Sequence, residues 1–269
     1  MAGRLPLRGL PFLKGHGTQN DFVLLPDFQG ALALTPDAVR RLCDRRQGLG
    51  ADGVLRVVPA ALDADAESDD GWFMDHHNAD GTTAEMCGNG IRVFARYLVA
   101  AGLEQPGALR VVTRAGVKDL EVEPGDGDVT VDMGPAEVGD VLEVDGDKAQ
   151  FVSMGNPHAV LPVPSVDALG ELRPDRLDLN VEYVEDVSDT HIRMRVHERG
   201  VGETRSCGTG ACAAVVATSL RTGAPRGTPF DVDVPGGRLV ITWQADGRVS
   251  MRGPAVLLAE GVLDPAVLT

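Results

Sequence analysis

The sequence lacks several features that mark other protein classes. Its four cysteines are too few and too scattered for a disulfide framework, and it contains no Cys-Xaa-Xaa-Cys pair of the kind that structural zinc sites use. No window stays apolar over the roughly 18 residues that a membrane-spanning helix needs. The N-terminal stretch is interrupted by Pro and Gly and has no continuous apolar core of a signal peptide. We therefore expect a cytoplasmic protein without a metal site.

Positive charge is also scarce, with 25 Lys and Arg against 40 Asp and Glu and a net charge of −15. This balance argues against nucleic acid and anionic membranes as partners. It does not exclude a small anionic substrate, which a few backbone amides or one Arg can bind. Only three lysines are present (Lys14, Lys118 and Lys148), and we find no P-loop or convincing G-x-G-x-x-G, so a pyridoxal or nucleotide cofactor has little support.

One motif occurs twice. Asn78–Gly90 ends in Cys-Gly-Asn-Gly, and Glu198–Gly210 ends in Cys-Gly-Thr-Gly, with nine residues from the first residue to the cysteine in both copies. An apolar run with helical character follows each copy. Gly-Pro-Ala also recurs, at 134–136 and 253–255, with an offset of 119 residues, while the two cysteines are 120 apart. The near-constant offset indicates an internal duplication.

The remaining segments alternate like strands with turn residues between them. A strand, a polar turn and a strand occupy 12–28, and a helix capped by Thr35 begins at Pro36 and places Cys43 in the core. We expect 59–71 to be a solvated acidic loop and Val166–Leu172 a short helix. Hairpins should follow each cysteine helix.

These patterns predict an α+β fold of two similar domains related by a pseudo-twofold axis. Each domain should be a strand-rich sheet wrapped around a central helix, with the active site in the cleft between them. The expected N-terminal half comprises 1–132 joined by 256–269 and carries Cys87. The C-terminal half comprises 133–255 and carries Cys207.

A cysteine at a helix N-terminus lies near unpaired N–H groups and the positive end of the helix dipole, which should favour its thiolate. Two such cysteines on opposite faces of a bound carbon form a base and acid pair, which suits racemisation or epimerisation. The ordinary alternative is that both are small buried hydrophobic residues. Their duplication in Gly-rich helix starts favours the catalytic interpretation. Cys212, inside its apolar helix, we interpret as core.

The chain resembles the diaminopimelate epimerase family from end to end. The matching stretches are HGTQNDF (16–22), GLGADG (48–53), NADGTTAEMCGNGIR (78–92), MGNPHAV (154–160), LNVEYV (179–184), ERGVGETRSCGTGACA (198–213) and PGGRL (235–239). The resemblance implies a cofactor-independent isomerase that interconverts LL- and meso-2,6-diaminopimelate in lysine and peptidoglycan precursor biosynthesis. It also implies a small-molecule substrate and allows a homodimer.

The resemblance assigns roles to particular residues. Cys87 and Cys207 match the two catalytic thiols, the first as proton donor and the second as acceptor in the LL-to-meso direction. His158 and Glu198 match polar groups that assist proton transfer. The other matches are substrate-binding positions: Gly88 with Asn89 and Gly208 with Thr209 for the reacting carboxylate, Asn20, Asn78, Asn156 and Asn180 as binding asparagines, and Glu198 with Arg199 for the amino and distal carboxylate groups.

The chain departs from the family pattern in places. Some members have a substrate-contacting Gln where this chain has Gly53, and Gln19 stands where Gly is frequent. Two alternative isomerases and one alternative from another class remain open. A proline or hydroxyproline racemase-like isomerase would use the same thiols on a smaller substrate, and Arg199 argues against it. A phenazine-biosynthesis-like isomerase would lack the cysteine pair. From another class, the chain could be a thiol redox sensor or a non-catalytic binding protein.

Overall fold

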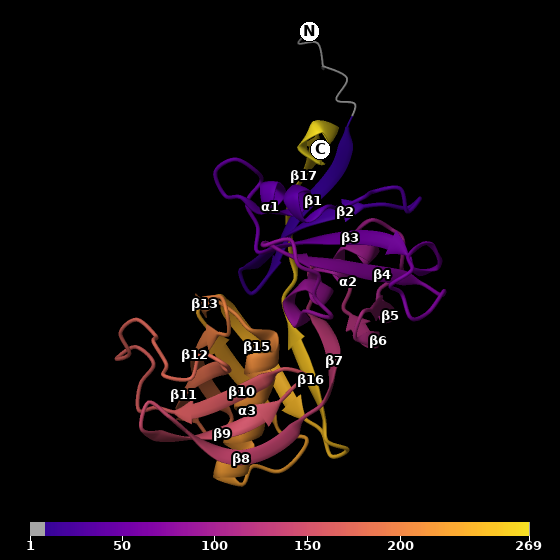
Figure 1. Ribbon diagram of the computed structural model, residues 1–269. Helices are drawn as coiled ribbons and strands as arrows, with labels where there is room; N and C mark the ends of the chain where they lie inside the picture. The colour runs from indigo at the N-terminus through magenta and orange to yellow at the C-terminus, as the bar shows by residue number, and fades with distance from the viewer. Residues whose placement is uncertain (1–8, 269) are drawn as a thin grey trace. The chain divides into compact units, whose positions relative to one another are not determined.

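The computed structural model describes residues 9–268, which divide into two compact units, 9–126 with 255–268, and 127–254 (Figure 1). The elements of the first unit are β1 (Leu10–Gly17), β2 (Asn20–Pro26), α1 (Pro36–Cys43), β3 (Gly53–Pro59), the 3₁₀ turn η1 (Ala60–Leu62), β4 (Trp72–Asn78), α2 (Gly88–Ala100), β5 (Gly107–Thr113), β6 (Gly116–Val122), β17 (Val256–Leu263) and η2 (Pro265–Leu268). The elements of the second are β7 (Val129–Pro135), β8 (Glu137–Val144), β9 (Asp147–Ser153), β10 (Pro157–Pro162), β11 (Asn180–Ser188), β12 (His191–Glu198), β13 (Gly202–Thr204), α3 (Gly208–Thr222), β14 (Pro229–Val234), β15 (Gly237–Trp243) and β16 (Arg248–Gly253).

The strand pairings repeat between the units. In the first, the order β17-β1-β2-β3-β4-β5-β6 pairs antiparallel, antiparallel, parallel, antiparallel, parallel and antiparallel. In the second, β8-β9-β10-β11-β12-β14-β15 follows the same series, and β16 and β7 extend it. The long helix lies between the fifth and sixth strands of each series. The duplication predicted from two short motifs therefore extends to the whole topology of both units.

Each long helix packs against strands of its own unit, as the α+β prediction requires. Helix α2 contacts β1 to β6 and β17, and α3 contacts β9 to β12 and β14 to β16. Residues 88–98 of α2 and most of α3 are buried. The predicted boundary at residue 132 falls inside β7. Because β7 pairs with β16, the whole strand belongs to the second unit.

The predicted helix at Val166–Leu172 is wrong, because this segment is a turn followed by irregular chain. Gly170 disfavours a helix here, because glycine is about 1 kcal/mol less favourable than alanine inside a helix. The guanidinium of Arg195 instead binds the backbone carbonyls of Val166, Leu169 and Gly170 at 2.8–3.1 Å. A side chain from a distant strand thus satisfies carbonyl groups in the irregular segment.

The acidic loop 59–71 is also more ordered than predicted. Arg56, almost fully buried on β3, contacts three carboxylates: Asp75 at 2.8 Å, Asp27 at 3.2 Å and Asp63 of the loop. Asp75 in turn contacts His77 at 2.8 Å and Arg114 at 2.7 Å. We call these six residues the buried ion cluster. It anchors the acidic loop to the sheet of the first unit.

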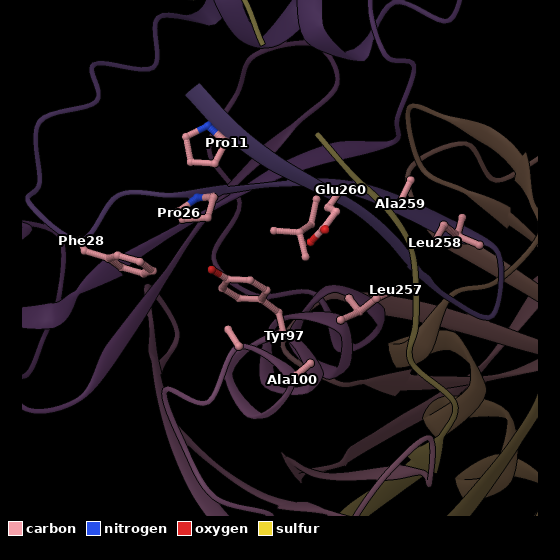
Figure 2. A pocket seen from close by; sticks show the side chains of 11 residues that line it. Pro11, Pro26, Phe28, Tyr97, Ala100, Leu257, Leu258, Ala259 and Glu260 are labelled. Carbon is pink, nitrogen blue, oxygen red and sulfur yellow. The ribbon is translucent and has the colours of Figure 1, made fainter. Parts of the chain in front are cut away.

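Both units contain an apolar hollow at equivalent places. In the first, a cavity of about 530 Å³ lies among β17, β1, the end of β2 and α2; Figure 2 shows the Tyr97 ring in the middle of its lining residues. In the second, a smaller cavity of about 270 Å³ lies among β8 to β11 and α3. Neither cavity is lined by a residue that the sequence analysis assigns to catalysis or substrate binding, so we look for the site at the helix starts.

Candidate functional site

Both cysteines of the repeated motif are helix N-caps. Cys87 and Cys207 have extended backbones (φ −135° and −121°) and precede α2 and α3 directly. In each case the sulfur accepts the backbone N–H of the glycine three residues on, Gly90 or Gly210, at 3.4 Å. The duplicated sequence thus folds into the same local geometry twice, with a sulfur among the N–H groups of a helix start.

In the first unit, Asn20 connects the cysteine to the hairpin of β1 and β2. Its Oδ1 accepts from the Cys87 thiol at 3.7 Å and from Asn89 Nδ2 at 3.2 Å. Its Nδ2 donates to Asp52 Oδ2 at 2.8 Å, and Arg45 forms an ion pair with the same Asp52 at 2.7 Å. Asp52 therefore fixes which end of the Asn20 amide faces the thiol. The sequence analysis missed this role, although Asp52 lies in the GLGADG match.

The turn before Asn20 has an unusual backbone. Thr18 and Gln19 have φ angles of 48° and 62°, a left-handed conformation that costs a non-glycine residue roughly 1–2 kcal/mol. Thr18 is buried, and its hydroxyl donates to Asn89 Oδ1 and accepts from Arg92 Nη2, both at 3.3 Å. These bonds stabilise a strained turn next to Asn20. The sequence offered one signal, the Gln at a position where Gly is frequent.

Asn78 ends β4 and lies opposite Gly53 of β3. Its Nδ2 donates to Thr82 Oγ1 at 3.0 Å, within the loop that leads to Cys87. A Cβ at Gly53 would lie 2.7 Å from the His77 carbonyl oxygen. The His77 carbonyl group therefore leaves no space for a side chain at Gly53 unless the backbone shifts.

In the second unit, Cys207 is buried with two carboxylates close by. Burial raises the pKa of its thiol well above the usual value, and Glu198 and then Glu182 raise it further. Burial also raises the pKa of Glu198, whose carboxylate accepts the Thr204 hydroxyl. The expectation that the helix start favours a thiolate is therefore wrong for Cys207, because burial and the carboxylates outweigh the bond from Gly210 N–H.

A chain of hydrogen bonds runs from a buried carboxylate to this thiol. His158 Nδ1 lies 2.7 Å from Glu182 Oε1, and its Nε2 lies 2.9 Å from Asn156 Oδ1. Asn156 Nδ2 donates to Thr209 Oγ1 at 3.3 Å, and that oxygen is 3.5 Å from Cys207 Sγ. The sequence analysis selected His158, Asn156 and Thr209 but missed Glu182, whose only signal was a charge within the buried run NVEYV.

Asn180 and Arg199 lie next to this chain of hydrogen bonds, since Asn180 bonds to Pro157 and to Arg199. The buried Asn180 amide donates to Pro157 O and accepts from Arg199 N, both at 3.0 Å, so it joins β10 to the end of β12. The Arg199 side chain is exposed and forms no ion pair within residues 9–268. An unpaired guanidinium of this kind can bind a carboxylate with two parallel hydrogen bonds.

The predicted residues divide between the two units. The first contains Asn20, Asn78, Cys87, Gly88 and Asn89, and the second contains Asn156, His158, Asn180, Glu198, Arg199, Cys207, Gly208 and Thr209. Over the part of the chain that the structure describes, no three His, Cys, Asp or Glu side chains are arranged to hold a metal ion. In the same range, no helix is long and apolar enough to cross a membrane.

Comparisons with known proteins identify the family to which the chain belongs. A model of the family described as Diaminopimelate epimerase matches residues 12–139 and 150–258. The diaminopimelate epimerase of Streptomyces coelicolor is 53% identical, over 96% of this chain and 97% of the relative, and that of Rhodococcus jostii is 45% identical, over 95% and 97%.

Solved structures share the fold at low identity. They include a predicted epimerase from Pseudomonas aeruginosa (TM-score 0.73, 18% identity, 94% of this chain and 99% of that one). A hydroxyproline epimerase from Agrobacterium vitis also matches (TM-score 0.69, 16% identity, 96% and 93%). These likenesses establish the two-unit α+β architecture and, at such identity, nothing further.

Proposed function

Because the chain belongs to the diaminopimelate epimerase family, we propose that it interconverts LL- and meso-2,6-diaminopimelate without a cofactor. The observation that carries this proposal is the duplicated helix start, in which Cys87 and Cys207 each cap a helix and receive the N–H of a following glycine. The reaction needs one thiolate and one thiol, which is what two such cysteines provide.

In the proposed reaction, one thiolate takes the α-proton from one face of the carbon, and the other thiol gives a proton to the opposite face. The C–H bond breaks on one side and a new one forms on the other, so the two sulfurs exchange protonation states in each turnover. Without a cofactor to delocalise the carbanion, the charge must be stabilised on the substrate carboxylate. The backbone N–H groups at Gly88 and Asn89, and at Gly208 and Thr209, are the donors we assign to it.

The surroundings of Cys207 fit a role that changes with the bound substrate. In the free protein, burial, Glu198 and Glu182 raise the pKa of the Cys207 thiol, so it is protonated. A substrate ammonium group beside Glu198 would neutralise that carboxylate and lower the thiol pKa again. Cys207 could then serve as base in the LL-to-meso direction and as acid in reverse. We assign Arg199 to the distal carboxylate, and Asn20, Asn78, Asn156 and Asn180 to the remaining polar groups.

The test is to incubate the reduced protein with LL-diaminopimelate in D₂O and to follow both the isomer ratio and deuterium at the α-carbon. We expect meso product that carries solvent deuterium, and loss of conversion in Cys87→Ala and in Cys207→Ala. Cys212→Ala is the matched control, because Cys212 is equally buried in α3 but lies outside the helix start. The proposal is refuted if the reduced wild-type protein neither converts nor exchanges the substrate.

The same assay distinguishes a diaminopimelate epimerase from the alternative, a proline or hydroxyproline racemase-like enzyme. Proline and hydroxyproline have no distal carboxylate, so an enzyme for them gains nothing from Arg199. We expect Arg199→Met to raise KM for diaminopimelate by roughly tenfold or more, because one charge-assisted pair is lost. Turnover of proline in place of diaminopimelate would favour the alternative.

A further inference from the structure

Glu182 is a fully buried carboxylate that the proposed reaction does not use. Its side chain on β11 has no exposed surface, and its Oε2 has no hydrogen-bond partner within the described residues. A buried carboxylate is costly unless positive charge compensates it. Two features supply that charge: His158, at 2.7 Å, and the N-terminus of α3. The carboxylate lies so close to this helix start that a Cβ on Gly210 would be 2.6 Å from Oε1.

The partners of His158 fix where its protons are. Asn156 Nδ2 donates to Thr209 Oγ1, so Asn156 Oδ1 is the atom that faces His158 Nε2. An amide oxygen only accepts, so Nε2 carries a proton. Nδ1 faces Glu182 Oε1, and it carries a proton as well where that carboxyl group is ionised. The N-terminus of α3, beside Glu182, favours this ionised pair of imidazolium and carboxylate.

The same logic fixes the last bond of the chain. Thr209 Oγ1 accepts from Asn156, and its own proton can be donated to Cys207 Sγ, 3.5 Å away, when the sulfur is a thiolate. All donors from His158 onward then point toward the sulfur. We infer that Glu182 is a positioning residue for Cys207: by holding His158 as an imidazolium, it orients Asn156 and Thr209 so that a hydroxyl proton stabilises the Cys207 thiolate. No proton passes through the Asn156 amide. The hydrogen-bond chain acts only through the direction in which its donors point.

This inference rests on the proposed function for its kinetic effect. In Glu182→Gln, the side chain keeps its size but loses the charge that holds the imidazolium. Because His158 loses its charge at the same time, the net charge of the pair is unchanged, and the direct effect of Glu182 on the pKa of the Cys207 thiol is offset. When His158 is neutral with its proton on Nδ1, Nε2 is unprotonated and can only accept. The Asn156 side-chain amide then flips, so that its Nδ2 donates to Nε2. The Asn156 oxygen then takes the Thr209 proton away from Cys207. Loss of this bond to a thiolate should lower kcat roughly 10- to 100-fold, with KM changed by less than about threefold.

A double-mutant cycle tests whether Glu182 acts on Cys207 through this hydrogen-bond chain or only supports the fold. Thr209→Val removes the hydroxyl directly and should lower kcat by a similar factor, while Thr209→Ser should retain it. If both residues act through one chain, Glu182→Gln combined with Thr209→Val should lower kcat no more than the worse single variant. Multiplicative losses would overturn the inference. Glu185→Gln is the matched control, since Glu185 lies on the same strand but pairs with Arg193, and its kcat should stay within about twofold of wild type.

The protonation of His158 can be measured without substrate. In the ¹⁵N-histidine spectrum at neutral pH, we expect both ring nitrogens of His158 to carry protons in the wild type and one in Glu182→Gln. If the wild type shows this signature but does not epimerise, the proposed function fails and the Glu182 arrangement stands. If it epimerises but His158 carries a single ring proton, or if folded Glu182→Gln keeps full kcat, the inference is wrong. The wild-type spectrum decides the point even if Glu182→Gln does not fold.

Discussion

The duplicated helix starts allow one substitution to be tested twice, with opposite expected signs. Gly90 and Gly210 are the third residues of α2 and α3, three positions after each cysteine. Neither has a positive φ angle, so alanine is compatible with the backbone at both. Replacing Gly by Ala in a helix stabilises it by roughly 0.5–1 kcal/mol. What decides the outcome is the space that the new methyl group meets.

At Gly90, the nearest atoms to an added Cβ are 3.4–3.5 Å away, which is ordinary contact. We therefore expect Gly90→Ala to raise the free energy of unfolding by about 0.5 kcal/mol. At Gly210, the Cβ would lie 2.6 Å from Glu182 Oε1 and 3.2 Å from its Cδ. Glu182 has no room to retreat, because it is buried and bonded to His158. Overpacking of this kind costs about 1–3 kcal/mol, so Gly210→Ala should be net destabilising.

The two tryptophans provide the assay, because Trp72 lies in the first unit and Trp243 in the second. Urea unfolding followed by fluorescence, in Trp72→Phe and Trp243→Phe backgrounds, reports each unit separately. We expect the Gly210→Ala midpoint to fall in the unit that Trp243 reports, and the Gly90→Ala midpoint to stay or rise in the other. The reasoning is refuted if Gly90→Ala is the more destabilising substitution, or if Gly210→Ala leaves its unit unchanged.

Three further predictions concern charge. Arg56→Met leaves Asp27 and Asp63 of the buried ion cluster without their Arg56 partner and should lower the free energy of unfolding by about 3–5 kcal/mol in urea; a loss below 1 kcal/mol contradicts this. Burial raises the pKa of Asp75, but its His and Arg partners lower it more, so the net shift is downward. Ionised Asp75 stabilises the folded state, fully so at pH values above the pKa that Asp75 has in the unfolded chain, and this stabilisation is lost as the pH falls through its lowered pKa in the folded state. Urea midpoints should therefore fall less between pH 6 and pH 3 in Asp75→Asn than in wild type. Glu198→Gln removes a charge that raises the pKa of Cys207, so iodoacetamide should label Cys207 severalfold faster at pH 8 by peptide mass spectrometry; an unchanged rate argues against this electrostatic effect.

The sequence predicted those features that depend on neighbouring residues. The helix starts at Cys87 and Cys207 follow from a Cys-Gly-Xaa-Gly turn before an apolar run, and both are found. The burial of Cys43 follows from the apolar face of its helix. The two-unit α+β architecture follows from the repeat, and its strand pairings agree.

What the sequence did not predict depends on residues brought together from distant strands. The predicted helix near residue 166 fails because Arg195 binds its carbonyl groups. Asp52 and Glu182 acquire their roles only when β3 and β11 place them beside Asn20 and His158. A hydrophobic period or a cap rule contains no information about such contacts, because they join residues 24 or more positions apart.

The same limit explains why the expected thiolate is wrong at Cys207. The helix-start argument applies equally to both cysteines, since both accept a glycine N–H at 3.4 Å. The surroundings differ, however. The partners of the half-buried Cys87 include an amide oxygen, whereas Cys207 is buried beside Glu198 and Glu182. The duplication preserved the backbone of the cap, and the side chains from other strands diverged around it. Such a difference favours one thiol and one thiolate over two sulfurs in the same protonation state, and one of each is what the proposed reaction needs.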